Sequence, residues 1–274
     1  MKKLKQTLKT ILVITLIITV FSCNKDDDNP TPIVEPTVYV TGNEINTIDI
    51  AKFWENGIDT NLTDGTNATT ASIYVTDSDV YIAGYGSNGF NLIAKFWKNG
   101  VATNLTDGTE SAITTSVYVD GTDVYLAGSE YSSSISVAKF WKNGVATSLT
   151  DGTQHSLANA VYVNNNDVYV AGFGYSGLIS VAKLWKNGVD TNLTDGTQRS
   201  IANAVYVDNN DVYVAGFESN GLNNVAKVWK NGVATNLTDG TQNADATAIF
   251  VKDSDVYVAG YEFNGTKDVF GRMV

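Results

Sequence analysis

Short runs of alternating apolar and polar residues recur at a fixed spacing along most of the chain. Tryptophan marks this recurrence at five positions, separated by 43, 44, 44 and 44 residues. These positions are Trp54, Trp97, Trp141, Trp185 and Trp229. A repeat of this length is typical of the four-stranded blades of a β-propeller, in which one supersecondary unit is copied several times. The pattern therefore predicts an all-β fold, with the tryptophans in its core.

The copy that begins at Ser156 shows the four strands of the predicted blade. They cover residues 157–163, 168–172, 181–185 and 189–193. The first strand is rich in small residues, so we expect it to be innermost, where blades crowd one another. Asn187-Gly188 predicts a type I′ hairpin between the third and fourth strands. Up-and-down alternation then places the variable loop after the second strand on the same face as the Thr-Asp-Gly crossover to the next copy.

The number of copies predicts six blades within residues 32–274. The second strand of the blade appears six times, and the third also appears six times if residues 269–272 form a degenerate copy. The fourth strand appears five times. We therefore expect a six-bladed β-propeller whose last blade lacks its outer strand, with residues 32–34 as the first strand of the first blade. A five-bladed ring with loose terminal strands is the alternative.

The sequence layout ANAVYVxxNDVYVAGFxSxG…VAKxWKNG resembles SBBP-type β-propeller repeats, and the resemblance spans about 240 residues. The chain departs from that pattern in its WKNG turn and its NLTDGT tail. The resemblance implies a propeller architecture. It implies little about function, because propellers carry many different functions.

The N-terminus has the layout of an export signal. Four lysines precede an apolar stretch over residues 11–21, which is too short to span a bilayer comfortably. Val20-Phe21-Ser22-Cys23 resembles a bacterial lipobox, which implies cleavage before Cys23 and acylation of that cysteine. An ordinary signal peptide with an incidental cysteine is the alternative. We expect residues 1–22 to be the signal peptide, followed by the lipidated Cys23 and a flexible acidic tether over residues 23–31.

The residues after Cys23 also resemble the surface-export signal of Bacteroidota lipoproteins. This resemblance implies a lipid anchor in the outer membrane and display at the cell surface. The formal net charge is −11, and 14 basic against 29 acidic residues remain once the four leader lysines are removed. A chain without a basic patch is poorly suited to bind phosphates, so we expect no nucleic-acid partner.

Catalytic chemistry has little support in the sequence. The chain has one histidine, His155, and one cysteine, so a histidine-dependent triad would have to use His155. His155 lies in a crossover, where the equivalent residues of other copies are expected to be Glu110, Arg199 and Asn243. The crossover aspartates Asp64, Asp107, Asp151, Asp195 and Asp239 lie at one level of the repeat. Asx-turns explain them better than a ring of metal ligands, because one carboxylate per loop is a poor calcium site. We expect no catalytic residue, no cofactor and no metal site.

The aromatic residues that end the second strand are the candidate ligand-binding residues. They are Tyr85, Phe173, Phe217 and Tyr261, and Ser129 and Asn43 interrupt the series. Glu130, Glu218 and Glu262 follow directly in three copies. Aromatic rings at this place can stack on sugar rings or anchor a peptide. Plugs over the core between blades are the alternative interpretation.

The leading functional hypothesis is a non-enzymatic, surface-anchored propeller that binds an extracellular glycan or protein. Residues 137–173 and 181–217 differ at 6 of 37 positions, which predicts near-equivalent sites and hence avidity. A structural role as a scaffold within an envelope complex is the second hypothesis. A polysaccharide hydrolase that depends on an asymmetric acid, such as Glu110 or Glu130, is the third.

Overall fold

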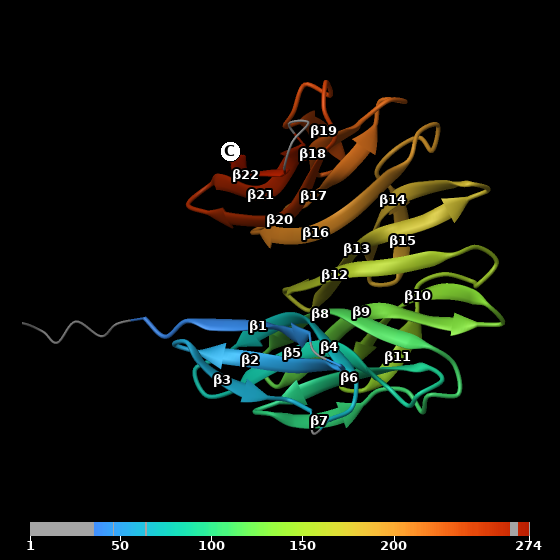
Figure 1. Cartoon of the computed structure of the whole chain (residues 1–274). Coiled ribbons are helices and arrows are strands. Elements are labelled where there is room, and N and C mark those ends of the chain that lie inside the picture. The colour runs from blue at the N-terminus through green and yellow to red at the C-terminus, as the bar shows by residue number, and fades with distance from the viewer. Residues whose placement is uncertain (1–35, 46, 64, 264–267, 274) are drawn as a thin grey trace, which may run out of the picture. The chain divides into compact units, whose positions relative to one another are not determined.

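The computed structural model describes residues 36–45, 47–63, 65–263 and 268–273. Within these ranges the chain is all-β and forms 22 strands in six antiparallel sheets. Figure 1 shows the sheets following one another in chain order, from blue at β1 to red at β22. In the described ranges, no helix has the length and apolar character that crossing a bilayer requires.

The first two sheets contain β1 (Tyr39–Ile45), β2 (Asp49–Glu55) and β3 (Ile58–Asn61), then β4 (Ala68–Val75), β5 (Val80–Ser87), β6 (Leu92–Lys98) and β7 (Val101–Asn104). The third and fourth contain β8 (Ala112–Asp120), β9 (Asp123–Ser132), β10 (Ile135–Lys142) and β11 (Val145–Ser148), then β12 (Ser156–Asn164), β13 (Asp167–Ser176), β14 (Ile179–Lys186) and β15 (Val189–Asn192). The fifth and sixth contain β16 (Ser200–Asp208), β17 (Asp211–Ser219), β18 (Asn224–Lys230) and β19 (Val233–Asn236), then β20 (Ala244–Lys252), β21 (Asp255–Phe263) and β22 (Asp268–Met273).

The prediction of six blades is confirmed, and the five-bladed alternative is wrong because the end segments form sheets of their own. The last sheet has the order β20-β21-β22, so it lacks the fourth strand as predicted. Met273 pairs with Val258 as Trp229 pairs with Val214, which confirms residues 269–272 as part of a degenerate third strand. Residues 32–34, predicted as the first strand of the first blade, lie outside the described residues.

The first strand of each complete blade is the inner one, as predicted. Neighbouring sheets contact each other through β4, β8, β12, β16 and β20, while the fourth strands are exposed along their length. Each inner strand contains a β-bulge. In β12 the register shifts between Ala158 and Ala160, and the extra residue, Asn159, donates its side-chain N–H to the carbonyl oxygen of Ala202 on the next inner strand (2.8 Å). The bulges therefore join consecutive blades.

The bulge also explains the glycine of the Ala-Gly pair in the second strands of the second to sixth blades, β5, β9, β13, β17 and β21. A Cβ atom placed on Gly172 would lie 2.1 Å from the carbonyl oxygen of Leu157, which no side chain can accommodate. The same approach, at 2.0–2.1 Å, is found at Gly84, Gly128, Gly216 and Gly260. Glycine is present here because the bulged inner strand passes too close for any Cβ.

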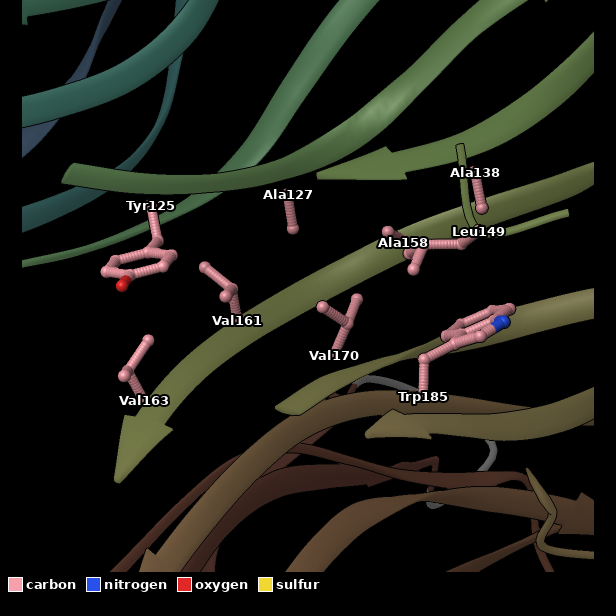
Figure 2. Close-up of a cluster of buried hydrophobic side chains, with 9 residues drawn as sticks. All are labelled: Tyr125, Ala127, Ala138, Leu149, Ala158, Val161, Val163, Val170 and Trp185. Atoms are coloured by element: carbon pink, nitrogen blue, oxygen red, sulfur yellow. The ribbon is translucent and has the colours of Figure 1, made fainter. Parts of the chain in front are cut away.

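The core lies between consecutive sheets and repeats from one interface to the next. Figure 2 shows one such cluster, in which Tyr125, Ala127, Ala138 and Leu149 of the third blade meet Ala158, Val161, Val163, Val170 and Trp185 of the fourth. The predicted core position of the tryptophans is confirmed for four of them, which are fully buried. Trp54, in the first sheet, is only half-buried.

Two kinds of turn lie along one edge of the sheets: the hairpins after the third strands and the turns between the first and second strands. We call this edge the turn face. Asn187 and Gly188 have φ angles of 52° and 82°, so the predicted type I′ turn is confirmed. The Asn187 side chain accepts a hydrogen bond from the Val168 N–H (2.8 Å) and donates one to Asp167 (2.7 Å). Lys186 pairs with the same aspartate at 2.7 Å. The WKNG motif thus fastens each hairpin to the neighbouring turn.

Candidate functional site

The opposite edge of the sheets, which we call the loop face, is made by the loops after the second strands and by the crossovers between sheets. Hydrogen bonds hold these two kinds of loop together. Asn91 donates its side-chain N–H to the carbonyl oxygens of Gly108 (3.1 Å) and Thr109 (3.0 Å). Asn223 makes the corresponding bond to Gly240 (3.1 Å). The prediction that the variable loops and the crossovers share one face is confirmed.

The crossover aspartates have the structural role expected of them. Asp195 accepts hydrogen bonds from the Thr197 N–H (2.9 Å) and hydroxyl (2.7 Å), which hold its pKa below the usual value. Asp107, Asp151 and Asp239 make the same Asx-turn. Asp64 lies outside the described residues. Within the described part of the chain, no three His, Cys, Asp or Glu side chains gather where they could hold a metal ion.

The four candidate aromatic residues lie where the second strands reach the loop face. Tyr85, Phe173 and Tyr261 are half-buried, whereas Phe217 is 3% exposed. The guanidinium group of Arg199 lies over the Phe217 ring, 4.8 Å from its centroid. Each aromatic residue pairs with the inner strand of its own sheet, as Phe217 does with Ile201. Their proposed role in binding stays a prediction, and the burial of Phe217 favours the core-plug interpretation for that residue.

The candidate glutamates are engaged within their own sheets. Glu218 pairs with Lys227 on the adjacent strand (2.7 Å), and Glu130 forms the same ion pair with Lys139. All four side chains are largely buried, and in each pair the lysine balances the negative charge of the glutamate. In the last blade, the position that carries this lysine is Gly271 by register, which distinguishes Glu262 from the other two.

His155 fastens a loop. Its Nδ1 accepts a hydrogen bond from the Ser136 N–H (3.1 Å) at the start of β10. Ser111 accepts the equivalent bond from Leu92 (3.2 Å), and Asn243 accepts one from Asn224. The counterpart of His155 in the third blade is therefore Ser111, and the sequence comparison that paired His155 with Glu110 was one residue out of register. This contact gives His155 a structural task shared by three different side chains.

A row of tilted and edge-to-face aromatic rings also lines the inner strands. Tyr74, Tyr118, Tyr162, Tyr206 and Phe250 form a row with centroid separations of 4.7–5.2 Å. Burial raises the pKa of Tyr118 and Tyr162 above the usual value for tyrosine. The contacts run from ring to ring, so these residues join consecutive blades.

Sequence reasoning missed the apolar side chains at the loop tips. Phe90, Leu178 and Leu222 are 95%, 97% and 91% exposed, respectively. Each follows a glycine at the tip of the loop after the second strand: Gly89, Gly177 and Gly221. An apolar residue directly after a tip glycine, in three of the copies, is the sequence signal that could have revealed them. The loop face therefore presents large apolar groups to solvent.

The sequence matches no protein family, and no curated protein is similar to it. Solved structures do share its fold. The chain is similar to TolB from Acinetobacter baumannii, with 10% identity and a TM-score of 0.52 over 86% of this chain and 62% of TolB. It is also similar to Kuenenia stuttgartiensis hydrazine synthase, with 9% identity and a TM-score of 0.53 over 87% of this chain and 44% of that protein.

The chain thus spans less than two thirds of the length of either protein. At about 10% identity, this likeness shows the β-propeller fold and carries no information on function. Beyond the propeller architecture, the resemblance to SBBP-type repeats stays a prediction. The predicted signal peptide and tether, and Cys23 with its predicted lipidation, lie outside the described residues.

Proposed function

We propose that the chain is a non-enzymatic binding propeller, held at the outer membrane through lipidated Cys23, whose loop face docks an extracellular protein. The observation that carries this proposal is the exposure of Phe90, Leu178 and Leu222 on one face. Large apolar side chains exposed on a common face are typical of interaction sites, because burying them on a partner releases water. The expected glycan remains the alternative ligand.

Two features favour a protein over a glycan. Aliphatic tips such as Leu178 and Leu222 offer hydrophobic area without the flat ring on which a sugar stacks. The candidate glutamates Glu130 and Glu218 are paired with lysines and so are poorly placed to accept hydrogen bonds from sugar hydroxyls. The exposed tips therefore match an apolar protein surface better.

Site-specific photocrosslinking in cells that produce the full chain tests this proposal. A photoreactive amino acid at position 90, 178 or 222 is expected to give one discrete adduct with the same protein. The matched control is Val145, which is 71% exposed and follows a hairpin of the turn face. A crosslinker at Val145 should give no such adduct.

The outcomes separate the candidate functions. Equal adducts from the loop tips and from Val145, or none from either, would contradict docking through the loop face. An adduct with polysaccharide would favour the glycan alternative. Turnover of a polymer that is lost in Glu110→Gln would favour the hydrolase, and a stoichiometric adduct from both faces would favour the scaffold.

A further inference from the structure

Ser129 occupies a position that carries an aromatic ring in four other blades. Its register partners are Ile113 and Ala138, which correspond to Ile201 and Ala226 around Phe217 in the fifth blade. The backbone of the third blade therefore follows the same course as that of the fifth. Only the ring is missing.

A cavity lies where that ring would be. It has a volume of about 250 Å³ and is lined by Ser111, Ser129 and Ser136 and by Leu92, Ala112, Ile113, Tyr131, Leu157 and Phe173. An apolar cavity of about 150 Å³ is enough to hold a benzene ring. The side chains of three consecutive blades thus leave room for a ring that the chain itself does not supply.

The fifth blade shows what this environment accommodates. There Phe217 fills the equivalent position and Arg199 lies over its ring at 4.8 Å. In the third blade the counterparts of both residues are serines, Ser129 and Ser111. The missing pair is therefore an aromatic ring with a cation stacked above it.

A second recess continues from the cavity toward solvent. It has a volume of about 390 Å³ and shares Leu92, Ser111 and Tyr131 with the cavity. Glu110 lines this outer recess, and glutamine occupies the same position in the next three blades. The exposed carboxylate of Glu110 adds a negative charge next to the apolar cavity, so a ligand with a positive charge beside its ring is favoured.

We propose that this cavity, which we call the Ser129 pocket, takes one aromatic side chain of the docked protein, with a neighbouring basic side chain at Glu110. The inference rests on the proposed function and identifies the anchor of the partner. A pyranose fits less well. The Ser111 hydroxyl already bonds to Leu92 and Asn91, and the Ser136 hydroxyl contacts His155, so most sugar hydroxyls would be left without partners.

Capped dipeptides test the pocket on the purified full-length lipoprotein in detergent. N-acetyl-Phe-Arg-amide is the probe, and N-acetyl-Ala-Arg-amide and N-acetyl-Phe-Ala-amide are its matched controls. We expect the Phe-Arg probe to bind at least about tenfold more tightly than the Ala-Arg control, since an aromatic anchor contributes most of the affinity in such a pocket. Glu110→Gln should weaken the Phe-Arg probe about threefold and leave the Phe-Ala control unchanged.

Ser129→Phe provides the decisive variant, because it restores the ring that the repeat carries elsewhere and should fill the pocket. It should abolish binding of the Phe-Arg probe while the melting temperature stays equal to or above that of the wild type. Val145→Phe, which adds a ring on the turn face away from the pocket, is the matched control and should bind normally. Unchanged binding in a folded Ser129→Phe protein, or equal binding of methyl glucoside and the Phe-Arg probe by the wild type, would overturn the inference.

The crosslinking experiment distinguishes failure of this inference from failure of the proposed function. If the adducts from positions 178 and 222 form but no dipeptide binds, the pocket inference is wrong and docking through the loop face stands. If no adduct forms from the loop tips, the proposed function fails, whichever dipeptide binds.

Discussion

The turn face and the loop face use their polar side chains in opposite ways. On the turn face one set of contacts recurs: a lysine and an asparagine of the hairpin hold one aspartate, as Lys186 and Asn187 hold Asp167. The same set is found at Asp79, Asp123 and Asp211. On the loop face no such set recurs. The crossover residue directly before the inner strand is Ser111, His155, Arg199 or Asn243 in successive blades.

The two faces differ because their structures restrict the residue type to different degrees. Hairpin geometry requires a positive φ angle and a specific acceptor, and few residue types satisfy both. On the loop face a strand needs only one acceptor for a backbone N–H, so Ser111, His155 and Asn243 serve equally well. Positions free to vary in this way are those where a binding site can evolve without loss of the fold.

The largest effect is expected from breaking the turn face at Asn187. Asn187→Ala puts alanine, which tolerates the left-handed region less well than asparagine, at φ 52° and removes the bonds to Val168 and Asp167. We expect it to lower the free energy of unfolding by about 2 kcal/mol. Urea unfolding measures this. Asn187→Gly keeps the turn angle, so it should cost about half as much, and an equal cost would show that backbone strain plays no part.

A change of pH is expected to have a smaller effect on stability. A rise in pH should weaken the contribution from Asp245, near the loop face, whereas a fall in pH should weaken that from Asp167 on the turn face. Burial raises the pKa of Asp245, near the loop face, to about 7, although Asn203 donates a hydrogen bond to it and Arg199 lies nearby. The unfolded chain ionises near pH 3.8, so the contribution of Asp245 is fully present below that pH and is lost as the pH rises to 7. Allowing for solvent screening, we expect a loss of about 1.5 kcal/mol.

The control for this prediction is on the turn face. Lys186 and Asn187 lower the pKa of Asp167, so its contribution is present above pH 3.8 and is lost as the pH falls through its folded-state pKa. Melting temperatures between pH 3 and pH 8 should therefore show less decline toward pH 7 in Asp245→Asn and less decline at acid pH in Asp167→Asn. If Asp245→Asn retains the wild-type decline above pH 4, the assignment to Asp245 is wrong.

The smallest effects distinguish two ion pairs. Lys227 and Glu218, next to the loop face, are largely buried, whereas Lys186 on the turn face is half exposed. Lys227→Met leaves Glu218 without its lysine and should cost about 1 kcal/mol, whereas Lys186→Met should cost less, because water screens the exposed pair. Thermal unfolding at low and high salt compares the two costs. Equal costs would mean that burial does not decide the strength of these pairs.

Much of the fold was predictable because its signals are local or periodic. The Asn187-Gly188 turn is specified by two adjacent residues, and the buried tryptophans by a repeat spacing that survives any error at strand ends. The candidate site was harder to predict from the sequence. Glu130 and Glu218 were predicted to face a ligand, but lysines nine residues further along the chain reach them across the strand pair. The pairing of His155 with Glu110 failed because residues in a loop carry no alternation that fixes their register.

The repeat, the number of blades, the course of the strands and the turn chemistry can all be inferred from the amino-acid sequence, since each follows from contacts between residues close in the chain. Which side chains are exposed depends on how the blades pack in the folded chain. Phe217 is covered and Phe90 is open, although both are aromatic residues near the same edge. Burial depends on neighbours from other blades, and a pocket such as that at Ser129 is bounded by residues of three blades whose separation in the sequence gives no hint that they meet.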